Sequence, residues 1–125
     1  MGENDLSYKI VGAALQIHKE LGPGLLESVY ENLLAYELRA QGLLVRSQVV
    51  MPLVYKEVKI ESAYRVDLLV ENKVIIELKS VETLAPVHYA QTLTYLKLSG
   101  LKLALLINFN TPKLKEGIHR LVNNL

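Results

Sequence analysis

Three charged residues interrupt a segment that is otherwise rich in Val, Ile and Leu. They are Asp67, Glu77 and Lys79, and the segment runs from Arg65 to Ser80. A sequence that only builds a hydrophobic core would not place charges there, because burying an unpaired charge is costly. These three residues are therefore the first candidates for chemistry.

The segment is predicted to form two strands joined by a three-residue polar turn. Such a turn pairs Val70 with Val74 and sets the register of the hairpin. Because successive strand side chains point to opposite faces, Asp67 then lies across from Glu77, with Lys79 two positions along. Directly opposed side chains have Cβ atoms roughly 4.5–5.5 Å apart, so the two carboxylates would crowd each other.

Two opposed carboxylates need compensation, since like charges in direct opposition destabilise a sheet. A divalent cation bound through oxygen ligands would provide it. Two alternatives stay open on these residues alone. Lys79 could neutralise an incidental pair at a sheet margin, or the register could be shifted so that Asp67 and Glu77 never meet.

The rest of the chain predicts one α/β domain over residues 1–125, with helices flanking a mixed central sheet. Residues 44–60 look extended, with Pro52 favouring an edge strand or a bulge and a turn expected at Lys56 and Glu57. The helix–strand order is α-α-β-β-β-α-β-α. The other expected elements are helices from Asp5 or Ser7 to Leu21, from Pro23 or Gly24 to Gln41, from Pro86 to Ser99 and from Pro112 to Val122, and strands over 59–70, 73–79 and 102–109.

Two of the predicted helices carry polar side chains that could belong to a site. Glu27 lies in the first turn of the second helix, where the helix dipole favours a carboxylate, and Tyr30 follows three residues later. His88, Gln91 and Tyr95 form one stripe at spacings of three, four and seven. From helix physics alone, capping by Glu27 and packing by Tyr30 are the better explanation, and a polar stripe is usually a solvated face.

Composition excludes several classes of protein. The chain is 50% hydrophobic and 22% charged, which fits a soluble globular domain. Its formal net charge of +1 gives no strong overall attraction to nucleic acid or membrane, so any polyanion site must be local. No cysteine is present, which excludes disulfides and thiolate chemistry and makes a cytoplasmic location the default.

Four short motifs, in this order, resemble those of the PD-(D/E)XK nuclease superfamily and its RecB-like members. Segments 24–30, 64–67, 77–79 and 91–95 read GLLESVY, YRVD, ELK and QTLTY. The first is more narrowly similar to the signature of the GxxExxY proteins. Val66 stands where the superfamily's name has Pro. The resemblance implies a restriction-endonuclease-like core.

The resemblance also implies a set of metal ligands and a catalytic lysine. Asp67 and Glu77 resemble the metal-binding carboxylates, with the backbone carbonyl of Leu78 as a further ligand. Glu27 resembles the helix acid that completes the metal site. Lys79 resembles the lysine that orients the attacking water or helps to deprotonate it.

The motif residues on the predicted helices would bind or orient the substrate. Gln91 and Tyr95 resemble residues that contact the nucleic-acid backbone, and Tyr30 and His88 are grouped with them. The function implied is hydrolysis of DNA phosphodiester bonds by metal-activated water, with Mg²⁺ as the cofactor and Mn²⁺ as a substitute. Family analogy also suggests a homodimer. The alternative is a catalytically silent nucleic-acid-binding or regulatory protein on the same fold, which the near-neutral charge favours.

Overall fold

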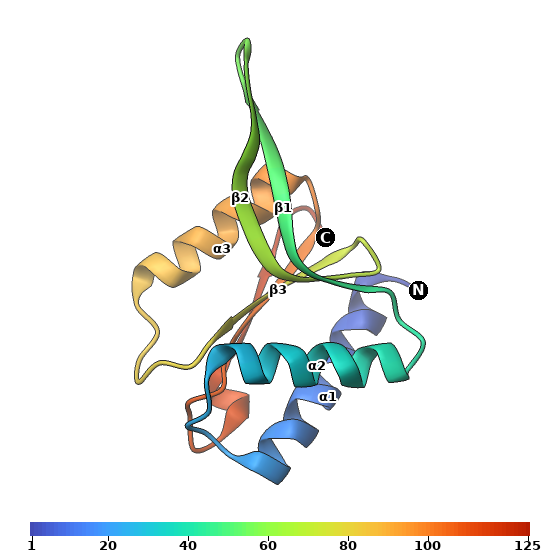
Figure 1. Ribbon diagram of the computed structural model, residues 1–125, viewed down its shortest axis with the longest axis vertical. Helices are drawn as coiled ribbons and strands as arrows, with labels where there is room; N and C mark the ends of the chain where they lie inside the picture. Colours follow the sequence, from blue (N-terminus) through green and yellow to red (C-terminus); the bar gives the residue numbers. More distant parts are fainter.

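The computed structural model describes residues 1–125 as a mixed β-sheet with helices on both faces (Figure 1). Helices α1 and α2 lie on one side of the sheet and α3 lies on the other. This arrangement confirms the predicted α/β class. The elements are α1 (Glu3–Leu21), α2 (Glu27–Ala40), β1 (Val45–Tyr55), β2 (Val58–Val70), β3 (Val74–Lys79), α3 (Pro86–Ser99), β4 (Leu103–Asn108), the 3₁₀ turn η1 (Leu114–Gly117) and β5 (Ile118–Val122).

The strands lie in the order β1-β2-β3-β4-β5, and β3 and β4 are the one parallel pair. Helix α3 makes the crossover between them, as predicted. In the β2–β3 hairpin Val70 pairs with Val74, which confirms the predicted register. The paired residues extend to Leu68 and Ile76, so the next residues in that register are Asp67 and Glu77.

The sheet separates two hydrophobic cores. The larger has 21 buried residues from α1, α2 and one face of the sheet, including Ile76 and Leu78 of β3. The smaller has seven, including Ile75 of β3 and Leu96 of α3. Because neighbouring strand residues point to opposite faces, Glu77 lies on the same side as Ile75, facing α3. Strand β3 is thus covered on both sides, and a charge on it is buried.

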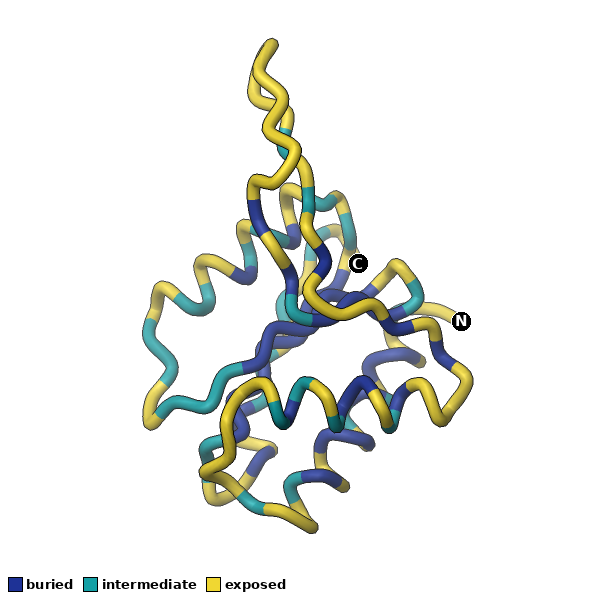
Figure 2. Tube along the Cα trace, viewed as in Figure 1, coloured by how far each residue is buried: buried dark blue, intermediate teal, exposed yellow.

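Strands β1 and β2 continue beyond the body of the protein as a two-stranded arm, residues 50–63 (Figure 1). Its turn lies at Lys56 and Glu57, where the sequence predicted one. The β1–β2 register shifts between Met51 and Leu53, which confirms the edge bulge expected from Pro52. Along the arm, every residue except Met51 and Leu53 is exposed (Figure 2).

The predicted start of the second helix is wrong. Helix α2 begins at Glu27, not at Pro23 or Gly24. Gly24 has a φ of 102°, which no right-handed helix accommodates, and Leu26 before the helix is extended. Helix α1 begins at Glu3, earlier than the predicted cap. No helix in the structure combines the length and the apolar composition that crossing a membrane requires.

The predicted terminal helix from Pro112 to Val122 is also wrong. The structure has the single 3₁₀ turn η1 there, followed by strand β5, which pairs antiparallel with β4. Strand β4 is buried along its whole length, so an unpaired edge would leave backbone groups without partners. Pairing with Ile118–Val122 satisfies that edge and outweighs the weak helical pattern of a short segment.

Candidate functional site

Asp67 and Glu77 meet where the β2–β3 ladder opens. Beyond the last paired residues, Leu68 and Ile76, the Asp67 side chain replaces a backbone acceptor of β2. Its Oδ2 accepts a hydrogen bond from the amide of Leu78 at 2.9 Å. The sequence register therefore brings these two carboxyl groups together, and we call them the acid pair.

Glu77 is the most perturbed ionisable group of the protein. Its side chain is 6% exposed, and its Oε1 is buried without a hydrogen-bond partner. Burial and, to a smaller extent, the neighbouring Asp67 charge raise the pKa of the Glu77 carboxyl to about 9, and the positive charge of Lys79 acts in the opposite direction. A buried oxygen without a donor is unusual in proteins and calls for an explanation. Without a cation, the Glu77 carboxyl stays protonated at neutral pH.

Lys79 is the last residue of β3 and is half-buried beside the acid pair. Its carbonyl accepts a hydrogen bond from the amide of Phe109 at 2.9 Å. The buried Asn108, its partner in β4, binds both backbone groups of Val81 with its side-chain amide, at 2.9 and 3.1 Å. These bonds fix the end of β3 and the chain that leaves it, so the backbone of Lys79 is rigidly held.

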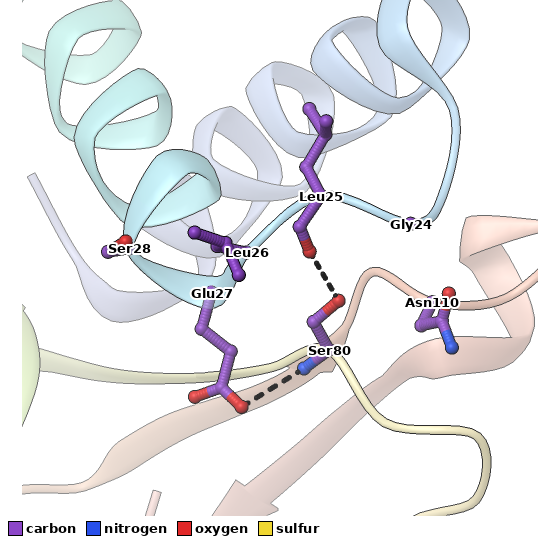
Figure 3. Close-up of a pocket in the computed structure, with 7 residues that line it drawn as sticks. All are labelled: Gly24, Leu25, Leu26, Glu27, Ser28, Ser80 and Asn110. Atoms are coloured by element: carbon purple, nitrogen blue, oxygen red, sulfur yellow. Dashed lines mark hydrogen bonds between the residues drawn. The ribbon is translucent and has the colours of Figure 1, made fainter.

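Glu27 lies at the end of β3, at the edge of an open pocket of about 600 Å³ (Figure 3). It is exposed, and its Oε2 accepts a hydrogen bond from the Ser80 amide at 3.4 Å. The Ser80 hydroxyl donates to the Leu25 carbonyl at 2.7 Å, which ties the loop before α2 to β3. Ser28 and Asn110 also line this pocket. The pocket therefore has polar groups beside the end of β3, and neither acid of the pair lines it.

Glu27 does not join the acid pair in this structure. No group of three Asp, Glu, His or Cys side chains lies close enough together to hold a metal ion. The assembled part is Asp67, Glu77 and Lys79, and the helix acid lies beside it, bonded to Ser80.

Tyr30 and His88 have structural partners. Tyr30 is fully buried, and its hydroxyl donates to the Gly22 carbonyl at 2.6 Å and accepts from the Leu25 amide at 3.1 Å. Its ring stacks on Phe109 with centroids 4.3 Å apart. His88 accepts a hydrogen bond from the Ala85 amide through Nδ1 at 3.0 Å and so caps α3. Tyr30 thus orients the loop that carries Glu27.

Of the two other predicted residues on α3, Tyr95 is near enough to the acid pair for its hydroxyl to respond to their charges, and Gln91 is exposed. Burial raises the pKa of the Tyr95 hydroxyl, with further contributions from the charges of Glu77 and Asp67. Its ring stacks on Tyr64, with centroids 4.7 Å apart. Gln91 is exposed, one turn earlier on the same helix. Tyr95 therefore forms the α3 side of the site.

Sequence reasoning missed two residues that contact Asp67 or its surroundings, namely Glu31 of α2 and Gln48 of β1. The Gln48 side-chain amide donates to Glu31 Oε1 at 2.6 Å and to Asp67 Oδ1 at 3.3 Å. The position of Glu31, four residues after Glu27, was an available signal. Gln48 had no such signal, because its place depends on where β1 passes α2.

The comparisons with known proteins give one match. A model of the PD-(D/E)XK nuclease superfamily matches residues 4–121. No curated protein and no solved structure matches the chain. The matched range runs from α1 into β5 and includes every residue of the site.

Proposed function

Because the chain belongs to the PD-(D/E)XK nuclease superfamily, we propose that it is a metal-dependent nuclease that hydrolyses DNA, with Mg²⁺ as the natural cation and Mn²⁺ as a substitute. The observation that carries this proposal is the buried Glu77 carboxyl beside Asp67, with one oxygen lacking a partner. Segment 24–30 further supports assignment to the GxxExxY proteins. The absence of cysteine is compatible with action in the cytoplasm.

The donor atoms suit a hard cation. Asp67, Glu77 and the backbone carbonyl of Leu78 offer oxygen ligands, which Mg²⁺ prefers. A cation there would supply the partner that the Glu77 oxygen lacks and would offset the like charges of the acid pair. Glu27 would complete the set from the N-terminus of α2, either directly or through water.

A bound divalent cation makes water a stronger nucleophile near neutral pH and offsets the charge that builds on an attacked phosphate. Lys79, fixed at the end of β3, would orient the attacking water and stabilise the developing negative charge with its ammonium group. Tyr95 and Gln91 would orient the substrate from α3. The pocket beside Glu27 offers hydroxyl and amide groups to the sugar-phosphate backbone.

A catalytically silent nucleic-acid-binding protein is the second candidate. The observation that favours it is a helix acid that lies apart from the acid pair, so that the catalytic set is incomplete in this structure. Such a protein would bind metal or DNA and would not cut.

The test is cleavage of single-stranded, duplex and branched DNA and of RNA, each with Mg²⁺ or Mn²⁺. We expect cutting by the wild-type protein and a loss of at least about a hundredfold in rate for Lys79→Ala, a typical value for a group that stabilises developing charge. Lys97→Ala, an exposed lysine on α3, is the matched control and should cut normally. Absence of cutting on every substrate, together with DNA retention at moderate salt, would favour the silent protein.

A further inference from the structure

Gln48 links two carboxylates that come from different elements. Its Nε2 donates to Glu31 of α2 at 2.6 Å and to Asp67 of β2 at 3.3 Å. An amide nitrogen carries two hydrogens, so one side chain can serve both acids. The neutral amide therefore lies between two groups that would otherwise repel each other.

The backbone of β1 is distorted at this position. Gln48 has a φ of 52°, a left-handed conformation that a residue other than Gly or Asn adopts only under strain. The β1–β2 ladder pairs Ser47 with Leu68 and Val49 with Val66, and it omits the pair of Gln48 with Asp67. Strain of this kind gathers at functional sites, where surrounding contacts maintain it.

Glu31 lies among charged groups of both signs, namely the carboxylates of Asp67 and Glu27 and the guanidinium of Arg65. Burial raises the pKa of the Glu31 carboxyl, the bond from Gln48 lowers it, and the Asp67 charge raises it again. On the other side of Asp67, the 6% exposed Glu77 has an oxygen without a partner. Asp67 thus has two acidic neighbours, Glu31 and Glu77, and the single Gln48 amide donates hydrogen bonds to both Glu31 and Asp67.

We propose that Glu31 is an additional cation-binding carboxylate of this site, and that the Gln48 amide occupies the place between Glu31 and Asp67 that a divalent cation takes on binding. This inference rests on the proposed metal requirement. In the metal-free protein Gln48 keeps the two acids together. On cation binding the amide leaves both carboxylates, so Gln48 lowers the affinity for the cation while holding its ligands in place.

The experiment is calorimetric titration of the full-length metal-free protein with Mn²⁺. Gln48→Ala removes the competing amide, and we expect its Kd to fall about three- to tenfold, the net worth of one ordinary hydrogen bond at an exposed site. Glu31→Gln removes a ligand, and its Kd should rise about tenfold. In the Glu31→Gln background the effect of Gln48→Ala should shrink, because the two residues act through the same contact.

The chain provides a matched control in α1. Gln16 Nε2 donates to Glu20 Oε1 at 2.6 Å, the same kind of bond at the same length, away from the site. Gln16→Ala should leave the Kd for Mn²⁺ unchanged. A second measurement needs no variant: on titration of the wild-type protein with Mg²⁺, the side-chain amide resonance of Gln48 should shift in NMR spectra while that of Gln16 stays fixed.

Different results overturn different statements. If Asp67→Asn abolishes Mn²⁺ binding while Gln48→Ala and Glu31→Gln match the wild type, the metal site stands and the roles of Gln48 and Glu31 are overturned. A Kd for Mn²⁺ that rises in Gln48→Ala, together with a wild-type Gln48 amide resonance that does not shift on titration with Mg²⁺, overturns the proposal that the cation displaces the Gln48 amide. A wild-type protein that binds no Mn²⁺ overturns both this inference and the proposed metal requirement.

Discussion

Replacing Glu77 with Gln should make the metal-free protein more stable at neutral pH. The Glu77 carboxyl has a pKa of about 9 in the folded protein, against an ordinary 4.5. At a pH below the pKa of the unfolded chain, the Glu77 carboxyl is protonated in both the folded and the unfolded state, and it does not lower the free energy of unfolding. At a pH between the two pKa values, the carboxyl loses its proton in the unfolded chain and keeps it in the folded protein, so the free energy of unfolding falls as pH rises. At a pH above the pKa of the folded protein, the carboxyl is ionised in both states and the loss of stability is complete.

The size of the effect follows from the shift. One pKa unit corresponds to about 1.36 kcal/mol, so the whole range from 4.5 to about 9 gives an upper limit of roughly 6 kcal/mol. Relaxation and water penetration around a buried charge reduce such penalties. We therefore expect the free energy of unfolding to fall by about 2 to 4 kcal/mol between pH 5 and pH 8. Because native proteins are stable by only about 5–15 kcal/mol, this change is easily measured.

The assay is urea unfolding followed by circular dichroism, in EDTA, from pH 5 to pH 8. Glu77→Gln keeps the shape of the side chain and removes its charge, so the variant should lose most of the pH dependence. Glu57→Gln, an exposed acid in the turn of the arm, is the control and should keep the wild-type slope. Adding Mg²⁺ at pH 8 should restabilise the wild type and not Glu77→Gln. If Glu77→Gln depends on pH as steeply as the wild type, burial of this carboxyl is not the cause.

Two further substitutions test the scaffold of the site. Gly117→Ala would place a Cβ 2.2 Å from the backbone oxygen of Asn108, so the free energy of unfolding should fall by about 1–3 kcal/mol. Gly12→Ala, with open space around it in α1, should leave thermal stability unchanged or raised, and equal effects at both positions would contradict the steric argument. Tyr30→Phe keeps the ring stack and loses the 2.6 Å bond to Gly22, which should cost about 1 kcal/mol in urea unfolding and also slow DNA cleavage. Normal cleavage in Tyr30→Phe would show that this bond does not orient the site.

The register of the central hairpin could be read from the sequence because strand alternation leaves little choice. A slip of one residue would move Asp67 and Glu77 to the side of the larger core and its aliphatic side chains to the other face. The turn at Asn72, in a left-handed conformation, fits the three-residue connection. Local chemistry and burial agree here, so the prediction held.

The chain ends were less predictable because their structure depends on distant partners. Residues Ile118–Val122 have both helical spacing and β-branched residues, and the open edge of β4 decides between them. The start of α2 was misjudged for a local reason. Pro23 is typical of a first helical turn, yet Gly22 and Gly24 on either side of it both have positive φ.

The candidate site also has residues that local sequence patterns predict and residues whose position depends on distant partners. Asp67, Glu77 and Lys79 followed from alternation, and Glu27 followed from a motif resemblance. Gln48 could not be found, because a left-handed glutamine in a strand has no sequence signature and its partners come from α2 and β2.

The site is also built from contacts of very different range along the chain. The bond between Asp67 and Leu78 closes a loop of 11 residues, whereas Glu27 and Ser80 are 53 residues apart. Short loops close at a lower entropic cost, so local contacts tend to form before distant ones. The folding chain therefore meets the cost of burying the Glu77 carboxyl beside Asp67 early, before the helix acid arrives. Acid pH or a divalent cation should then speed folding itself, which makes the charges of the site part of the folding barrier.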